Sequence, residues 1–306
     1  MFITCTDDLD KNIKKGDIFA LNGMWTKAAS QYSVAIIANP HDDLLYFKRG
    51  VAYRNSGDYT NAIADFNKVL ELSPKHANAY ADRALTYALD DNIRFAVNDM
   101  DTAISLDADV ARINEKEMVM AYYRLGVAYR ERGNMINAQA FLGKVIRFKP
   151  DMAEAYLERA KVYIFIGAPE LAISDLTKAI KYDAKSVDAY LIRCEAYLKK
   201  GEFKLALNDS SEAIILKPEA AFGYSIRGLT YFNLKNYESA RLDLDKAIKL
   251  DPDQAVSYFY RGQLYNDLQE FSLALADFTK TITLTKETVI AEKAESYIAD
   301  IISKRK

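Results

Sequence analysis

Few residues in this sequence could build a disulfide framework or a zinc site. The 306 residues include only two cysteines and two histidines. These numbers exclude a disulfide scaffold and any zinc site built mainly from Cys and His, although a metal site made of carboxylates alone stays open. No carboxylate pair stands out from the general surface charge, so we expect neither a metal nor a cofactor.

An excess of one charge is also missing. The chain has 41 Lys and Arg against 43 Asp and Glu, which gives a formal net charge of −2. So balanced a chain is not expected to attract nucleic acid or an anionic membrane through its overall field. We therefore expect no nucleic-acid partner.

Long apolar runs are absent as well. No stretch of 18 apolar residues occurs, and a membrane-spanning helix needs about 20. The first eight residues contain neither the basic region nor the apolar run of a signal peptide. We expect a cytoplasmic protein with no membrane insertion, while a leader removed ahead of Cys5 would leave a lipoprotein or an exported form open.

Proline and glycine are scarce, at 6 and 12 residues, whereas tyrosine is frequent at 21. This composition favours helices over loops. The prolines also reveal a period, because Pro40 and Pro74 lie 34 residues apart and so do Pro218 and Pro252. A fixed period of this length indicates a repeat array.

Eight windows of 34 residues follow when Leu9 takes the first place. They cover 9–42, 43–76, 77–110, 119–152, 153–186, 187–220, 221–254 and 255–288. The twentieth place is Ala in all eight windows, and the eighth is always Gly, Ala or Cys. The fourth and eleventh places hold Tyr in seven windows each, so most tyrosines belong to the repeat framework rather than to an aromatic ligand site.

Each window has the apolar spacing of two helices. Tyr46, Gly50 and Tyr53 step by four and three, and a second run with the same spacing starts at Ala62. Between the runs, residues 55–58 read Asn-Ser-Gly-Asp, which combines a turn with a helix-starting cap. The pattern predicts two antiparallel helices per window that approach closely at their small residues.

These landmarks resemble the tetratricopeptide repeat, which has a small residue, Tyr, Ala, Phe and Pro at fixed places of a 34-residue period. The resemblance implies an all-α, right-handed superhelical solenoid of antiparallel helix pairs. We divide the chain into an N-terminal extension (1–8), repeats one to three (9–110), an insertion (111–118), repeats four to eight (119–288) and a C-terminal capping helix (289–306). The insertion is expected to be helical, either as a lengthened first helix or as a separate short one.

A charged pattern distinguishes these repeats from the usual family pattern, which is apolar at the seventh place. Six windows have Arg at the seventh place, and the same six have Asp at the twenty-third. The two windows without Arg have Lys15 with Gln31 and Leu125 with Phe141. We predict structural ion pairs, within one repeat or between neighbours, from Arg49, Asp65, Arg83, Asp99, Arg159, Asp175, Arg193, Asp209, Arg227, Asp243, Arg261 and Asp277.

The resemblance also implies a concave groove, lined by the first helix of each pair, that binds a peptide or a partner protein. Carried over place by place, its contact residues in the first half are expected to be Phe47, Val51, Arg54, Tyr123, Val127 and Arg130. Apolar residues would anchor a partner segment, and the arginines would pair with its acidic groups. The Lys and Asn that some family members use to hold a chaperone C-terminus do not occur at the matching places.

The function expected from this sequence is therefore that of a non-catalytic scaffold or adaptor. No phosphate-binding Gly loop follows a strand pattern, and Cys194 occupies a packing place. The alternative is a regulatory or assembly subunit, possibly a homodimer, that acts through repeat four and the insertion at 111–118. A dimer lost on Met118→Glu and Met120→Glu would favour that alternative.

Overall fold

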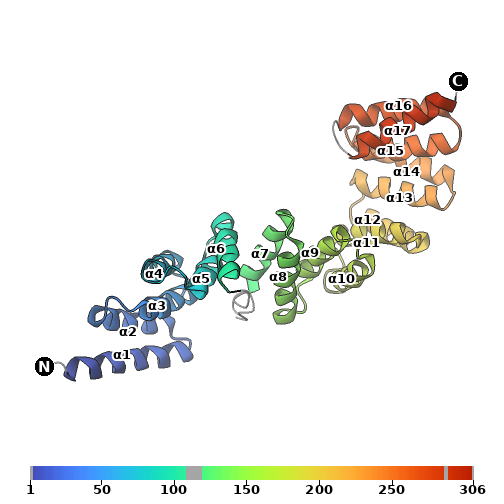
Figure 1. Cartoon of the computed structure of the whole chain (residues 1–306). Coiled ribbons are helices and arrows are strands. Elements are labelled where there is room, and N and C mark those ends of the chain that lie inside the picture. Colours follow the sequence, from blue (N-terminus) through green and yellow to red (C-terminus); the bar gives the residue numbers. More distant parts are fainter. Residues whose placement is uncertain (1–2, 108–118, 286–288, 305–306) are drawn as a thin grey trace. The chain divides into compact units, whose positions relative to one another are not determined.

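The computed structural model describes residues 3–107, 119–285 and 289–304, and no strand occurs among them. The chain divides into two compact units, 1–150 and 151–306, each a stack of helix pairs (Figure 1). The first unit contains α1 (Ile3–Leu21), α2 (Trp25–Ala38), α3 (Asp43–Asn55), α4 (Tyr59–Leu72), α5 (Ala77–Leu89), α6 (Ile93–Leu106), α7 (Val119–Glu131) and α8 (Met135–Phe148).

The second unit continues the same pattern and adds one unpaired helix at its end. Its elements are α9 (Ala153–Phe165), α10 (Pro169–Tyr182), α11 (Val187–Lys200), α12 (Phe203–Leu216), α13 (Ala221–Asn233), α14 (Tyr237–Leu250), α15 (Ala255–Asp267), α16 (Phe271–Leu284) and α17 (Val289–Lys304). The helix α1 begins at Ile3, within the segment that we predicted as an extension. The insertion at 111–118 lies outside the described residues.

Each turn between the two helices of a pair places one residue in the left-handed region. At Gly57 φ is +85°, and the Asp58 side chain then caps α4 by accepting a hydrogen bond from the Asn61 amide at 3.2 Å. The fifteenth place of every window has positive φ: Gly23, Gly57, Asp91, Gly133, Gly167, Gly201, Lys235 and Gln269. Five of these are Gly, for which this conformation costs little, and three are not.

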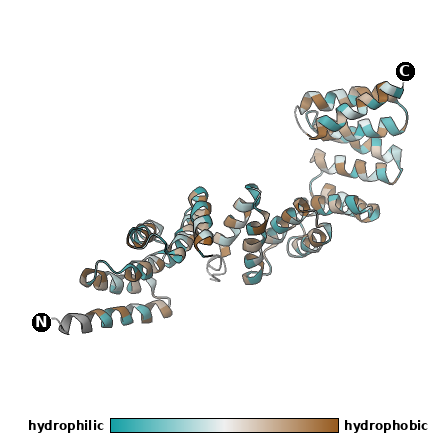
Figure 2. Ribbon diagram, viewed as in Figure 1, coloured by the Kyte–Doolittle hydropathy of each residue, from teal (hydrophilic) through white to brown (hydrophobic). Residues whose placement is uncertain are grey.

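Hydrophobic and hydrophilic residues are interspersed along the helices (Figure 2). The two helices of a pair pack through complementary side-chain sizes. All eight alanines at the twentieth place are fully buried. At the eighth place, an added Cβ on Gly50 would lie only 2.9 Å from Cε1 of Phe66, the residue at the twenty-fourth place. Across the windows, Gly faces Tyr, Phe or Leu, Ala faces Met or Leu, and Cys194 faces Ser210. The backbones approach closely because one partner is small wherever the other is large.

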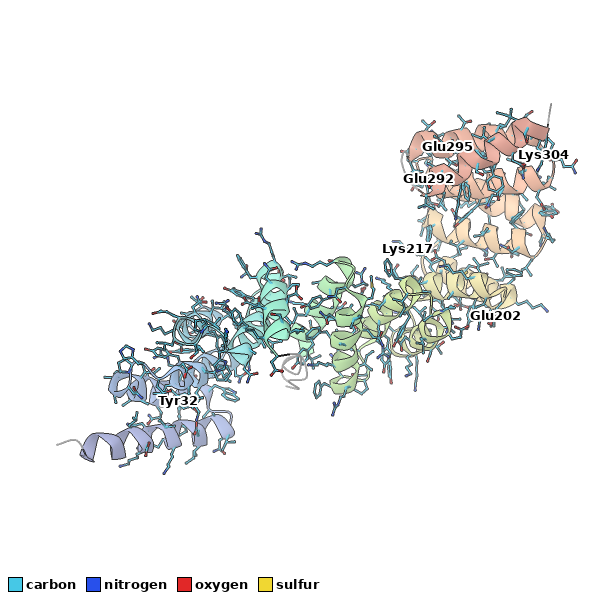
Figure 3. All side chains as sticks on the ribbon, in the orientation of Figure 1. Tyr32, Glu202, Lys217, Glu292, Glu295 and Lys304 are labelled. Atoms are coloured by element: carbon cyan, nitrogen blue, oxygen red, sulfur yellow. The ribbon has the colours of Figure 1, made fainter. Side chains whose placement is uncertain are left out.

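Polar contacts join neighbouring first helices in the first unit. The Tyr32 hydroxyl of α2, labelled in Figure 3, donates to Asp17 of α1 at 2.8 Å. Lys48 of α3 donates to the same Asp17 carboxylate, also at 2.8 Å. Burial, together with the hydrogen bond to Asp17, raises the pKa of Tyr32. This contact fixes the register between the first and second helix pairs.

The helix α17 covers the apolar side of the last pair. Its Ala294 and Ile301 are buried with Phe259 and Phe278. The Tyr297 ring stacks on Phe278 at a centroid distance of 4.9 Å. A repeat array needs such a cap because a terminal repeat otherwise leaves its inner face in water.

None of the described helices has the length and hydrophobicity that crossing a membrane requires.

Candidate functional site

The arginine and aspartate at the seventh and twenty-third places form a bidentate ion pair within each of the six repeats that have them. Arg159 of α9, for example, donates from Nε and Nη2 to the two carboxylate oxygens of Asp175 on α10, at 2.7 and 2.9 Å. The other five pairs are Arg49–Asp65, Arg83–Asp99, Arg193–Asp209, Arg227–Asp243 and Arg261–Asp277, with ion-pair distances of 2.6–2.8 Å. These arginines connect the two helices of one pair, so they are not a free track for a ligand.

Phe47 contributes to packing between repeats. Its ring stacks on His76 at 5.2 Å and lies 5.9 Å from the Phe66 ring. His76 is the N-cap residue of α5. Phe47 therefore connects α3 to the start of α5, and Val51, one turn further along α3, is half-buried as well.

The predicted role of Arg54 in binding a partner is wrong. We expected it to pair with acidic groups of a partner, but its side chain is fully buried and forms an ion pair with Asp82 of α5. A partner cannot reach a guanidinium with no exposed surface. Arg54 thus joins α3 to α5 inside the unit, as Lys48 and Asp17 join α3 to α1.

Tyr123 and Val127 of α7 line a common pocket. It has a volume of about 210 Å³ and is lined by Asp91, Ile93, Tyr123, Arg124, Val127, Ala128 and Glu131. Tyr123 and Val127 are at the fifth and ninth places of their window, on the face that the groove prediction assigned to a partner. Of the six residues predicted to contact a partner, these two line the pocket, and Phe47, Val51, Arg54 and Arg130 do not.

The wall of the pocket opposite α7 comes from the turn between α5 and α6. Asp91 occupies the left-handed place of this turn, with φ of +63°. Ile93 follows as the first residue of α6 and contributes the apolar part of the wall. The sequence did not lead us to either residue. Asp91 was nevertheless recognisable as unusual, because five of the eight windows have Gly at its place.

Arg124 holds the two walls of the pocket together. Its Nη1 donates to the carbonyl oxygens of Ala88 and Leu89, at 2.6 and 3.0 Å, at the C-terminal end of α5. The same Nη1 atom lies 3.5 Å from Oδ1 of Asp91. A cation at a helix C-terminus satisfies carbonyl groups that have no partner within the helix. Arg124 is therefore a positioning residue of the pocket.

In the two ion pairs at the pocket, the carboxylates are the more exposed partners. The Asp91 and Glu131 side chains are 82% and 63% exposed, whereas the cations beside them, Arg124 and Arg130, are 34% and 24% exposed. Arg130 lies 3.3 Å from the Glu131 carboxylate. A molecule that approaches the pocket from solvent meets the carboxylates first.

Three further hollows lie at turns between helices. Two cavities of about 390 Å³ each share Trp25 and Ser56 in the first unit. Another, of about 490 Å³, lies between residues 201–205 and Leu234 in the second unit. None of them contains a residue that the sequence assigned to a partner, except for the buried Arg54.

The described residues do not form a group of three or more His, Cys, Asp and Glu side chains that could bind a metal ion. Cys194 is fully buried, with its sulfur 3.2 Å from the Ala206 carbonyl oxygen. Burial raises the pKa of its thiol to about 12. Cys194 therefore has a packing role and is not poised as a nucleophile.

Comparisons with known proteins agree with this architecture. Two family models, both described as tetratricopeptide repeat, match residues 44–76, 121–152, 153–186 and 221–254. Human DnaJ homolog subfamily C member 3 is 25% identical over 178 residues, which are 55% of this chain and 35% of that protein. Serine/threonine-protein phosphatase 5 from Rattus norvegicus is 29% identical over 113 residues, which are 36% of this chain and 21% of that protein.

The chain thus spans about a third or less of the length of these curated relatives. Among solved structures, a chain in the crystal structure of the APC/C hetero-tetramer Cut9-Hcn1 resembles it with a TM-score of 0.53 and 15% identity. That similarity covers 94% of this chain and 54% of the other, and at this identity it concerns the fold alone.

Proposed function

Because the chain is a protein of tetratricopeptide repeats, we propose that it is a non-catalytic scaffold that binds a partner protein through an extended segment or helix. The segment lies on the first-helix face of the first unit, and one of its apolar side chains enters the α7 pocket. The observation that carries this proposal is the pocket itself, which brings Tyr123 and Val127 together with Ile93 and Ala128. The relatives support a role in protein interaction in general.

The size of the pocket matches a side chain rather than a whole small molecule. Its volume of about 210 Å³ is below the range of about 300–1,000 Å³ that is usual for small-molecule sites. Apolar anchors that enter a preformed pocket dominate the binding of many peptide segments. The alternative, an assembly subunit acting through residues 111–118 and repeat four, stays a prediction, since that insertion and Met118 lie outside the described residues.

The test uses a phage-displayed library of random peptides as the probe, selected on the immobilised full chain. The selected peptides should bind the wild type and lose at least about tenfold in affinity for Val127→Glu, because a carboxylate buried without a partner opposes an apolar anchor. The control is Ile136→Glu, because Ile136 is 83% exposed on α8 and lies outside the pocket. Binding that is equally strong to Val127→Glu and to the wild type would contradict the proposal, provided that circular dichroism shows both chains folded.

A further inference from the structure

We propose that the α7 pocket selects a partner segment in which the apolar anchor has a lysine or arginine beside it. This inference rests on the proposed function and specifies the chemistry of the partner. It also replaces our expectation of an acidic partner, which depended on Arg54 and Arg130. Arg54 is buried against Asp82, and Arg130 lies beside Glu131.

In both ion pairs at the pocket, the carboxylate is more exposed than the arginine. Each carboxylate at the rim has a cation on its inner side: Arg124 lies 3.5 Å from Asp91 and Arg130 lies 3.3 Å from Glu131. The arginines are the less exposed members of both pairs, and Arg124 also donates to two backbone carbonyls of α5. The carboxylates are therefore the charges that these two pairs present most openly to solvent, which favours a cation at the mouth of the pocket.

Two helices end at the pocket. The pocket lies at the C-terminal end of α5, which stops at Leu89, and along the last turns of α7, which stops at Glu131. Helix C-termini have a partial negative charge that attracts cations. Both helix ends therefore act in the same direction as the two carboxylates, whereas the α6 N-terminus at Ile93 has the opposite partial charge.

The pocket also has an apolar lining. Ile93, Val127 and Ala128 line the same pocket as the two carboxylates, and Tyr123 lines it with them. A long cationic side chain can rest its methylene groups on such a surface and keep its charged end in water. In a segment with an apolar anchor and a neighbouring Lys or Arg, the anchor packs on the apolar lining while the cation lies beside the carboxylates.

The experiment compares matched peptides and matched variants of the full chain. The probe is the tightest-binding peptide from the phage-displayed library, together with a copy in which its Lys or Arg is replaced by norleucine. The variant is Asp91→Gly combined with Glu131→Gln, which removes both carboxylates and leaves the apolar lining intact. Asp91→Gly also relieves the left-handed backbone, so the variant should fold.

The control is Lys235→Gly, which replaces a side chain at the same left-handed place, where φ is +61°, in the other unit. The wild type should lose about three- to thirtyfold in affinity on norleucine replacement, as expected for two exposed charge pairs. The Asp91→Gly/Glu131→Gln variant should bind both peptides alike, and Lys235→Gly should behave as the wild type. Affinity of the wild type for the cationic peptide should also fall as salt rises.

The proposal is overturned if selected peptides lack a cation near the anchor, or if the double variant binds the cationic peptide as tightly as the wild type does. Either result leaves the proposed function standing as long as Val127→Glu still abolishes binding. If Val127→Glu has no effect on any selected peptide, the proposed function itself fails. The two failures are therefore distinguishable in one set of measurements.

Discussion

At the scale of single residues, an arginine between two tyrosines recurs in six windows. The Arg159 guanidinium lies 6.0 Å from the Tyr156 ring centroid and 5.6 Å from that of Tyr163. Its partner Asp175 has a side chain only 4% exposed. In the fourth window Leu125 and Phe141 occupy the same two places, and Phe141 stacks on Tyr129 at 5.6 Å. An apolar pair thus fills the space that an ion pair fills elsewhere.

This substitution within the chain gives a direct prediction. Asp175→Ala should lower the free energy of unfolding by about 3 kcal/mol, because Arg159 is left half-buried without its carboxylate. Asp175→Ala combined with Arg159→Leu should cost less than Asp175→Ala alone. Arg159→Leu with Asp175→Phe, which copies the fourth window, should come within about 1 kcal/mol of the wild type. Urea denaturation measures the wild type, Asp175→Ala, Arg159→Leu and the two double variants, and simple addition of the effects of Asp175→Ala and Arg159→Leu would contradict the coupling.

What the sequence could predict about residues depended on repetition. The Arg and Asp of the six pairs vary together across eight aligned windows, so their pairing could be inferred without coordinates. Arg54 occurs once, and nothing in its own window shows that Asp82 of the next repeat lies against it. The sequence predicted only part of the pocket lining. Tyr123 and Val127 are at places that the repeat pattern assigns to the groove, whereas Asp91 and Ile93 come from a turn that this pattern does not include.

At the scale of helices, the distance between the members of a pair depends on the eighth and twenty-fourth places. Gly50 allows α3 to approach Phe66 of α4, which is fully buried. Ala84 in the next window faces Met100 instead, an unbranched side chain that adapts to the extra methyl group. The size of the residue at the eighth place therefore restricts which side chains fit at the twenty-fourth.

The prediction for the pair concerns Gly50→Ala. The new Cβ would lie 2.9 Å from Cε1 of Phe66, and overpacking of this kind costs about 1–3 kcal/mol. That exceeds the gain of about 1 kcal/mol from replacing Gly in a helix. Gly50→Ala with Phe66→Met, which copies the third window, should recover most of the loss in thermal denaturation. A double variant no more stable than Gly50→Ala would show that the two places do not compensate each other.

The existence of helices was the most predictable feature at this scale, because the spacing of apolar residues repeats in every window. The residues at which the helices begin and end were less predictable. The helix α1 begins at Ile3, where the period of 34 gave no reason to extend a helix upstream of Leu9. The cap at α17 was identifiable because its apolar stripe has no partner in its own segment.

At the scale of the molecule, the helix contacts join neighbours along the chain. Within each unit, every helix pair packs against the pairs before and after it. In such an array, stability is close to a sum of repeat terms and nearest-neighbour terms. Damage to one repeat should therefore spread to adjacent repeats first.

Hydrogen exchange can measure this spread. Asp243→Ala breaks the pair with Arg227 between α13 and α14. Amides of α13, α14 and their neighbours should exchange about ten- to a hundredfold faster, because exchange follows the local free energy of opening. Amides of α1–α8 should keep their wild-type rates. Equal acceleration throughout the chain would show instead that both units unfold as one cooperative body.

The location of the ion pairs inside single repeats has a consequence for how this chain can change its length. Each of the six arginines finds its aspartate 16 residues later, within the same 34-residue window. A duplicated or deleted gene segment of that length would copy or remove both partners together. Such an event would keep each of these six pairs whole, so the array could lengthen or shorten by whole repeats without separating any of these arginines from its aspartate. The boundary between the second and third repeats is the exception, because loss of one of these two repeats would leave Arg54 or Asp82 buried without its partner.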